Sequence, residues 1–251
     1  MEEAIAGTSV LVVGASAGIG REAALAYARA GARVMAVGRR EGNLRELAEI
    51  ADISWTVADI TQSGAPARIV EETVSAFGGI DIVLNVAAAS PMVLLAEADP
   101  EEILAVYASN VVAPSQVCRA ALPHLSTNGV VGFVSSETVG RPRKGLVPYG
   151  ASKAALEETI MGWRAENPEH RFATIRVGAT IGTDFGRDFT GELLGECIED
   201  WIRGGHIAAA LMDSVSVGTA VAEILAVGYL NPTIELTDFT IRPPGPLASL
   251  T

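Results

Sequence analysis

The chain has 251 residues, of which 49% are hydrophobic and 19% charged, and its formal net charge is -12. This length suits one large α/β domain or two small ones with a substantial core. The acidic balance argues against broad binding of DNA, RNA or anionic membrane, because those polyanions attract basic surfaces.

Short apolar runs alternate with helical patterns along the chain. Runs that are apolar on both sides indicate strands of a parallel sheet whose two faces are covered by helices. We therefore expect an α/β fold, a single-domain doubly wound, Rossmann-like sheet of about seven strands over residues 1–251. The expected elements are the strands Ser9–Val13, Ala32–Val37, Ile53–Val57, Ile80–Val86, Gly129–Ser136 and Arg171–Val177, and the helices Gly18–Ala30, Glu41–Ile50, Ala65–Phe77, Pro100–Leu125, Tyr149 to about Ala165, and Ser214–Val227.

The least regular stretch is residues 178–215, between the last of these strands and the last helix. So long a connection in a compact domain favours a substrate lid over a structureless loop. Its aromatic residues Phe185, Phe189 and Trp201 either line an apolar substrate pocket or serve ordinary packing, and His206 is a candidate substrate contact.

A glycine-rich turn follows the first expected strand. In "VVGASAGIGREAAL", Gly14, Gly18 and Gly20 stand at the start of a helix with the spacing G-x-x-x-G-x-G. Glycines at this position let the backbone approach a pyrophosphate at the helix N-terminus. The turn therefore predicts dinucleotide binding, although glycines also serve plain strand-to-helix turns.

The end of the second strand reports on the type of cofactor. An acidic residue there would bind both ribose hydroxyls and repel a 2′-phosphate, but this chain has Arg39 and Arg40. Because a guanidinium holds a phosphate through two hydrogen bonds, NADP(H) is preferred, with NAD(H) as the alternative. The alternative interpretation is that both arginines are ordinary solvated residues at the start of a helix. Asp59 either accepts from the adenine amino group or caps the following helix.

The stretch "VPYGASKAAL" places Tyr149 four residues before Lys153. Positions i and i+4 share a face of a helix. A phenol titrates near ~10, and a fixed ammonium beside it lowers that pKa. The pair suits proton transfer to or from a substrate oxygen, although the same spacing is common on half-exposed helices.

Together these motifs resemble the short-chain dehydrogenase/reductase family over about residues 7–235. The resemblance rests on "GASAGIG", on "NVAA" at Asn85–Ala88, on Asn110, on "VSSETVG" and on "YGASK", in that order. Departures are Val13 before the first glycine, the loss of the second asparagine and the glycine in "NVAA", and "GATIGT" without a proline-glycine pair. The serine is either Ser135 or Ser136, and Ser136 is preferred because it lies 13 residues before Tyr149.

The resemblance implies a role for each group. Tyr149 would be the acid or base at the carbonyl oxygen, and Lys153 would lower its pKa and hold the nicotinamide ribose. Ser136 would donate to the substrate oxygen, and Asn110 would hold a water that links Lys153 to solvent. Thr183 would touch the nicotinamide carboxamide or the phosphates. The expected cofactor contacts are Gly14, Ser16, Gly18, Ile19, Gly20, Arg39, Arg40, Asp59, Ile60, Asn85, Ala87, Tyr149, Lys153 and Thr183.

The expected function is an NADP(H)-dependent oxidoreductase that interconverts a carbonyl and a secondary alcohol on a small apolar molecule. The alternative is a catalytically silent dinucleotide-binding sensor or scaffold, in which at least one of the four catalytic groups would be replaced. The sequence retains all four. The resemblance also implies a homodimer or homotetramer.

The remaining features indicate location and metal content. The N-terminus carries two acidic residues and no basic region, and no apolar run approaches the ~20 residues needed to span a bilayer. Cys118 and Cys197 lack metal-like spacing and are expected to be free thiols in a reducing, cytoplasmic compartment. We expect no catalytic metal.

Overall fold

The computed structural model describes residues 4–187, 189 and 191–249. Its centre is a seven-stranded sheet in the order β3-β2-β1-β4-β5-β6-β9, and each neighbouring pair is parallel. The α/β fold class and the strand number predicted from the sequence are confirmed. The strands of this sheet are β1 (Ser9–Val13), β2 (Arg33–Gly38), β3 (Ile53–Val57), β4 (Ile80–Asn85), β5 (Leu125–Ser136), β6 (Arg171–Val177) and β9 (Asp238–Ile241).

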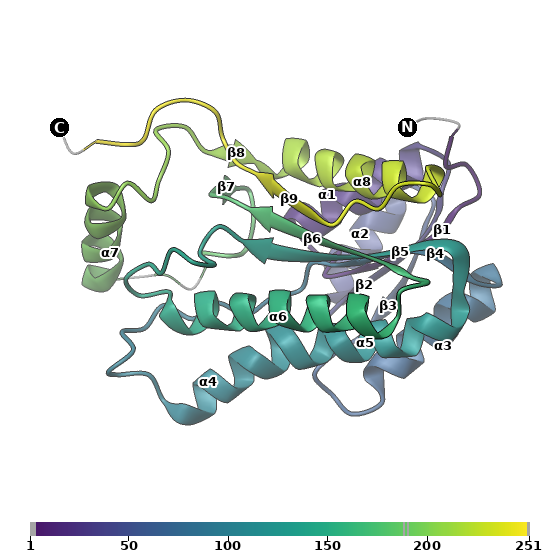
Figure 1. Cartoon of the computed structure of the whole chain (residues 1–251), viewed down its shortest axis with the longest axis horizontal. Helices are drawn as coiled ribbons and strands as arrows, with labels where there is room; N and C mark the ends of the chain where they lie inside the picture. The colour runs from purple at the N-terminus through teal and green to yellow at the C-terminus, as the bar shows by residue number, and fades with distance from the viewer. Residues whose placement is uncertain (1–3, 188, 190, 250–251) are drawn as a thin grey trace.

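Helices cover both faces of the sheet (Figure 1). In β1, Val10 and Val12 join one hydrophobic core, and Leu11 and Val13 join the other. Successive side chains of a strand point to opposite faces, so a strand between two helical layers must be apolar throughout. One face carries α1 (Gly18–Arg29), α2 (Glu41–Ile50) and α8 (Ser214–Leu230), and the other carries α3 (Ala65–Phe77), α4 (Pro100–Tyr107), α5 (Ala113–Ala121) and α6 (Val147–Glu166).

The helix expected over Pro100–Leu125 is not continuous. After α4 the chain widens into a π-helical turn at Ala108–Val112, continues as α5, and ends in a 3-10 turn at Leu122–His124. Pro114 has no N–H to donate to the carbonyl of Asn110 four residues earlier, and its ring would collide with that carbonyl in a regular helix. The π-helical turn accommodates this defect and has Asn110 at its centre.

Residues 178–215 contain structure that the sequence did not predict. The short strands β7 (Thr180–Ile181) and β8 (Met212–Asp213) pair with each other, and α7 (Gly191–Arg203) lies between them in the chain. Figure 1 shows α7 beyond the carboxyl ends of the strands. Residues 188 and 190 of the expected lid lie outside the described residues, as do residues 1–3 and 250–251 of the expected domain.

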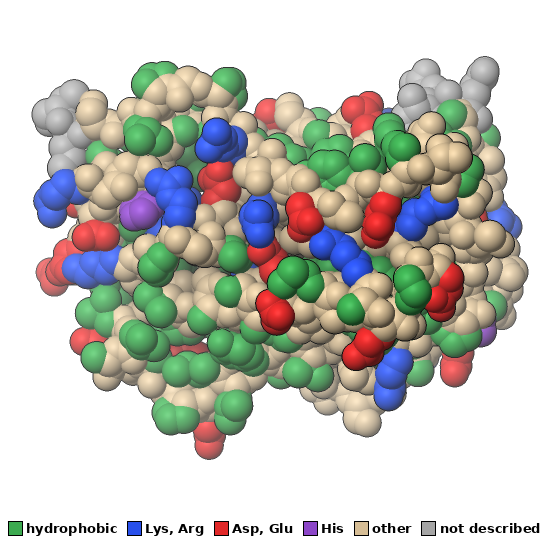
Figure 2. Space-filling view, in the orientation of Figure 1, with side chains coloured by type: hydrophobic (Ala, Val, Ile, Leu, Met, Phe, Trp, Pro, Cys, Tyr) green, Lys and Arg blue, Asp and Glu red, His purple; other side chains and the backbone are tan. Residues whose placement is uncertain are grey.

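The surface mixes acidic and basic side chains on the face shown in Figure 2. Apolar side chains gather at the lower left of that view, over α4 and the chain before it, where Leu95 and Leu104 are 58% and 68% exposed. Within the described residues, none of the helices is long and apolar enough to cross a bilayer.

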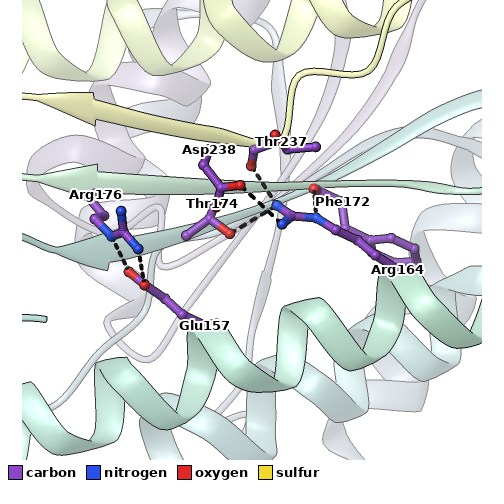
Figure 3. A network of polar contacts seen from close by, with 7 residues as sticks. All are labelled: Glu157, Arg164, Phe172, Thr174, Arg176, Thr237 and Asp238. Atoms are coloured by element: carbon purple, nitrogen blue, oxygen red, sulfur yellow. Dashed lines mark hydrogen bonds and ion pairs between the residues drawn. The ribbon is translucent and has the colours of Figure 1, made fainter. Parts of the chain in front are cut away.

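Arg164 near the end of α6 ties the last strand to the sheet (Figure 3). Its guanidinium donates to the carbonyl oxygens of Phe172 and Thr237, to Thr174 Oγ1 and to Asp238 Oδ2. The side chain is only 18% exposed. This one residue therefore joins α6, β6 and the start of β9, which is a strand that has only one neighbour.

Replacing Arg164 by Met should lower the free energy of unfolding by about 2 kcal/mol, because hydrogen bonds to a charged group are lost in a poorly solvated place. Denaturant unfolding measures this change. The control is Arg203→Met, whose ion pair with Glu199 on α7 is exposed and should contribute less than ~0.5 kcal/mol. Equal effects of the two variants would contradict the bridging role of Arg164.

Candidate active site

The carboxyl edge of the sheet carries the glycine turn between β1 and α1. Gly14 has φ +98, and a Cβ atom there would lie 2.6 Å from the backbone nitrogen of Ala87. A Cβ atom at Gly20 would collide with the carbonyl oxygen of Gly14. Side chains are therefore excluded from the turn, and its backbone stays open to a pyrophosphate at the N-terminus of α1.

The other residues expected at the adenosine and central parts of the cofactor lie around this turn. Ser16 and Ile60 are buried, and Ile19 in the first turn of α1 packs against the core. The backbone N–H of Ala87 donates to Val13 and extends the sheet. Asn85 is 4% exposed, and both polar atoms of its side chain lack a partner among the described residues. Such a buried orphan amide fits a site that awaits a polar ligand.

The two arginines after β2 differ in their surroundings. Arg39 is exposed, whereas Nη2 of Arg40 donates to Ser16 Oγ at 3.2 Å and pairs with Asp184 Oδ2 at 2.5 Å. Asp184 comes from residues 178–215, so an anionic group of this segment already faces the guanidinium. A phosphate at Arg40 would compete with that carboxylate.

Asp59 does not cap the following helix, contrary to the alternative interpretation of the sequence. The N-cap of α3 is Gly64, and Asp59 Oδ1 instead accepts from the N–H and hydroxyl of Thr61. The hydroxyl bond is the main reason why the pKa of Asp59 is lowered, with a smaller contribution from the charge of Arg39.

Tyr149 and Lys153 lie buried in the first turns of α6, with exposed fractions of 6% and 2%. Lys153 Nζ donates to the carbonyl oxygen of Val134 at 2.8 Å, and it lies 5.8 Å from the centroid of the Tyr149 ring. The structure therefore brings together the two residues that the sequence paired.

Burial dominates the pKa values of this pair. It raises the pKa of Tyr149 to about 12, and a hydrogen bond from Ser136 and the charge of Arg143 act in the opposite direction. Burial lowers the pKa of Lys153 to about 8, against the charge of Glu157. The sequence assigned the lowering of the tyrosine pKa to Lys153; in this structure the cation that contributes to it is Arg143. In the sequence, the basic run "GRPRKG" before the tyrosine is the feature that could have pointed to Arg143.

The two candidate serines have different partners. Ser136 Oγ accepts from the N–H of Thr138 at 3.2 Å and from its hydroxyl at 3.0 Å, which leaves the hydroxyl hydrogen of Ser136 for the hydrogen bond to Tyr149. Ser135 instead donates to Glu157 Oε1 at 2.6 Å. The preference for Ser136 as the serine near Tyr149 agrees with these partners.

Glu157 was not singled out by the sequence. Figure 3 shows it reaching from α6 toward Arg176 on β6, which donates to both carboxylate oxygens, at 2.8 and 2.5 Å. Glu157 lies one turn after Lys153 and is 8% exposed. The carboxylate therefore supplies negative charge near the buried lysine while Ser135 and Arg176 fix its position.

The side chain of Asn110 is fully engaged within the protein. Its Oδ1 accepts from the N–H of Ala89, and its Nδ2 donates to the carbonyl of Ala89 and to Ser152 Oγ. Ser152 in turn donates to the carbonyl of Tyr149. The side-chain amide thus joins the chain after β4 to the start of α6, and both of its N–H donors are used.

Residues after β6 lie over the glycine turn and the tyrosine. A Cβ atom at Gly18 would lie 3.1 Å from Thr183 Cβ. The ring of Phe185 packs edge-on against Tyr149 with centroids 5.0 Å apart, and Phe189 packs on Phe185 at 5.4 Å. Within the described residues there is no group of three His, Cys, Asp or Glu side chains arranged to hold a metal ion.

A comparison with known protein families shows to which family the chain belongs. The family model described as short chain dehydrogenase matches residues 8–191. This chain belongs to that family.

Two curated relatives illustrate the range of the short-chain dehydrogenases that the chain resembles. It is 36% identical over 172 residues to a hydroxysteroid 11-beta-dehydrogenase 1-like protein of Xenopus tropicalis, covering 65% of this chain. It is 35% identical over 149 residues to granaticin polyketide synthase putative ketoacyl reductase 2 of Streptomyces violaceoruber, covering 57% of this chain. The match spans 60% of the length of each relative.

Solved structures confirm the short-chain dehydrogenase fold. A short chain dehydrogenase from Burkholderia cenocepacia J2315 in complex with NADP superposes with a TM-score of 0.83 at 24% identity, over 96% of this chain and 98% of that one. An alcohol dehydrogenase from the archaeon Thermococcus sibiricus complexed with 5-hydroxy-NADP gives 0.80 at 21% identity, over 94% and 96%.

The burial of Lys153 predicts a pH dependence of stability. Its pKa is about 8 in the folded protein and near ~10.4 in the unfolded chain, so between these values the unfolded state binds more protons and stability rises with pH. Between pH 8 and 10, the free energy of unfolding of the wild type should rise by about 2 kcal/mol relative to that of Lys153→Met. Denaturant unfolding without cofactor measures this difference. A difference that does not change with pH would contradict the lowered pKa.

Proposed function

We propose that this chain is an NADP(H)-dependent oxidoreductase that interconverts a carbonyl and a secondary alcohol on a small molecule. The observation that carries the proposal is the buried pair Tyr149 and Lys153 beside Ser136, whose hydroxyl forms a hydrogen bond with the tyrosine. All three lie at the same edge of the sheet as the open glycine turn, which is where parallel α/β sheets bind their ligands.

The proposed mechanism assigns one task to each side chain. The nicotinamide supplies the hydride in reduction or accepts it in oxidation. Ser136 donates a hydrogen bond to the substrate oxygen, and Tyr149 gives its phenolic proton to that oxygen as reduction proceeds. Lys153 presents an ammonium to the ribose hydroxyls and to the developing phenolate. In the reverse direction Tyr149 accepts the proton of the alcohol.

Asn110 is proposed to act as a positioning residue. Its amide holds Ala89 and Ser152, and Ser152 holds the carbonyl of Tyr149. The water that the family resemblance assigns to Asn110 would have to be bound by the backbone of the π-helical turn, because both N–H donors of the side chain are already used.

The preference for NADP(H) is supported by Arg40 and Ser16, which lie together where the 2′-phosphate of an adenosine would follow β2. Structural neighbours crystallised with NADP or 5-hydroxy-NADP agree with this cofactor type. Asn85 and the glycine turn are proposed to contact the rest of the dinucleotide.

Residues 178–215 are proposed to serve as the substrate lid within a single dinucleotide-binding domain. Thr183 near the glycine turn and Phe185 against Tyr149 support this role. Exposed apolar residues on α4, on the π-helical turn after it and on α6, which include Leu104, Val112 and Met161, support pairing of two or four copies. The buried free thiols of Cys118 and Cys197 are consistent with a cytoplasmic location.

Replacing Tyr149 by Phe should lower kcat by at least about a hundredfold, because the proton donor is removed while the ring remains. The assay follows NADPH absorbance with a panel of ketones, and NADPH affinity should be unchanged. Tyr229→Phe is the matched control, since Tyr229 lies on α8 near Thr8 and Asp81 at the opposite edge of the sheet. Tight cofactor binding with no turnover of any substrate would favour the silent sensor or scaffold.

Replacing Arg40 by Ala should weaken NADPH binding by about tenfold or more and leave NADH binding little changed, because only NADPH carries the 2′-phosphate. Fluorescence titration of both cofactors measures the ratio. Arg39→Ala is the matched neighbour, and its exposed side chain should matter less than that of Arg40. Equal losses for the two cofactors would contradict a phosphate contact at Arg40.

A further inference from the structure

Arg143 is a buried cation without adequate partners. It is 9% exposed, and its Nε lacks a partner among the described residues. Its nearest carboxylate is Oε2 of Glu137, 3.8 Å from Nη2, which is too long for a hydrogen bond. A guanidinium has five N–H donors, and leaving them unsatisfied after desolvation is costly.

The backbone around Arg143 is firmly held. Arg143 lies in the connection from Ser136 to Tyr149, and its carbonyl accepts from the N–H of Leu146. The carbonyl of the next residue, Lys144, accepts from Trp201 Nε1 at 2.9 Å, and the Lys144 ammonium pairs with Glu196 on α7. The position of the guanidinium is therefore set by the fold on both sides.

Arg143 is linked to the start of α6 through Leu146, whose carbonyl accepts from the N–H of Gly150 next to Tyr149, and the charge of Arg143 acts against the rise in the pKa of the tyrosine. The other charged and titratable groups that act on this region are Glu137, Arg141, His206 and Asp200. Burial and the two arginines lower the pKa of His206, so it is neutral near pH 7, and its Nδ1 lacks a partner among the described residues. Two buried nitrogens of this region, Nε of Arg143 and Nδ1 of His206, therefore have no hydrogen-bond partner among the described residues.

The surroundings of Arg143 are otherwise apolar. Leu146, Cys197 and Trp201 form a small buried cluster. Met92 and Phe189 pack against this cluster, and Phe189 continues through Phe185 to the Tyr149 ring. An apolar wall with one fixed cation matches a ligand that has an apolar body and one anionic end.

We propose that Arg143 binds a carboxylate of the substrate, so that the site takes oxo acids and the corresponding hydroxy acids. This inference rests on the proposed redox function and narrows its substrate class. Arg143 lies in the connection between Ser136, the last residue of β5, and Tyr149 near the start of α6, so a carboxylate on its guanidinium would hold a substrate at the same edge of the sheet as those two hydroxyls. A guanidinium pairs with a carboxylate through two parallel hydrogen bonds, which also orients the ligand.

The reaction on such a substrate balances within the proposed mechanism. In reduction the carbonyl carbon gains the hydride and forms a C–H bond, the C–O π bond breaks, and the oxygen takes the proton of Tyr149. NADPH is oxidised to NADP⁺, and the carboxylate on Arg143 is unchanged.

The test compares ligands that differ only in charge. The protein saturated with NADP⁺ is titrated by calorimetry with short straight-chain and phenyl-substituted carboxylates and with the corresponding primary amides. The wild type should bind the best carboxylate about ten- to a hundredfold more tightly than its amide. Arg143→Met should abolish this preference, Arg143→Lys should restore part of it, and the matched control Arg141→Met should retain it.

The stability of the ligand-free variants provides a second readout. Because Nε of Arg143 is buried without a hydrogen bond and the ion pair with Glu137 is long, Arg143→Met should melt no lower than the wild type. A lower melting temperature or failure to fold would assign Arg143 to an ion pair with Glu137 and overturn the proposal. So would equal affinities for carboxylate and amide, or an equal loss of preference in Arg141→Met.

These results separate the two proposals. Carboxylate-selective binding that depends on Arg143, without turnover of any oxo acid, would support the anion site and contradict the redox function. Turnover of neutral ketones that depends on Tyr149, without selectivity for carboxylates, would support the redox function and contradict the role of Arg143.

Discussion

The burial of Lys153 under the carboxyl edge of the sheet is the constraint on which the site depends. An ammonium that is 2% exposed needs a fixed acceptor, and the carbonyl of Val134 provides it. The cost of desolvation also explains Glu157, which stands one turn later with its carboxylate held by Ser135 and Arg176. The carboxylate of Glu157 therefore joins α6 to β5 through Ser135 and to β6 through Arg176, and its negative charge also acts on the buried lysine.

A second arrangement covers the site from outside. The segment after β6 places Asp184 on Arg40, Thr183 beside Gly18 and Phe185 on Tyr149, so it touches the region from the adenosine end to the proposed acid. Exposed ion pairs such as that of Arg40 contribute little to stability. A dinucleotide phosphate can therefore displace the Asp184 carboxylate at small cost, while the aromatic contact keeps water from the tyrosine.

The cation whose charge acts to lower the pKa of Tyr149 is Arg143 and not the lysine that the sequence predicted. The i,i+4 spacing shows that Lys153 shares a face with Tyr149, but it does not show how far the ammonium is turned toward Val134. Arg143 reaches the tyrosine from a loop in which helical spacing carries no information. The charge that acts to lower the pKa of the tyrosine therefore comes from Arg143, and burial outweighs it.

The sequence alone determined the sheet, its helical layers and the identity of Tyr149, Lys153 and Ser136, because strand and helix periodicity and motif spacing are local properties. It also located the glycine turn, whose role depends on backbone freedom. It missed the break at Asn110 in detail, the pairing of β7 with β8, the edge strand β9, and the roles of Glu157 and Arg143. Pro114 was a local signal for the break at Asn110, whereas the strand pairings and the surroundings of Glu157 and Arg143 were decided by tertiary structure, because they depend on contacts between residues distant in the chain and on which charges lose their water when the chain folds.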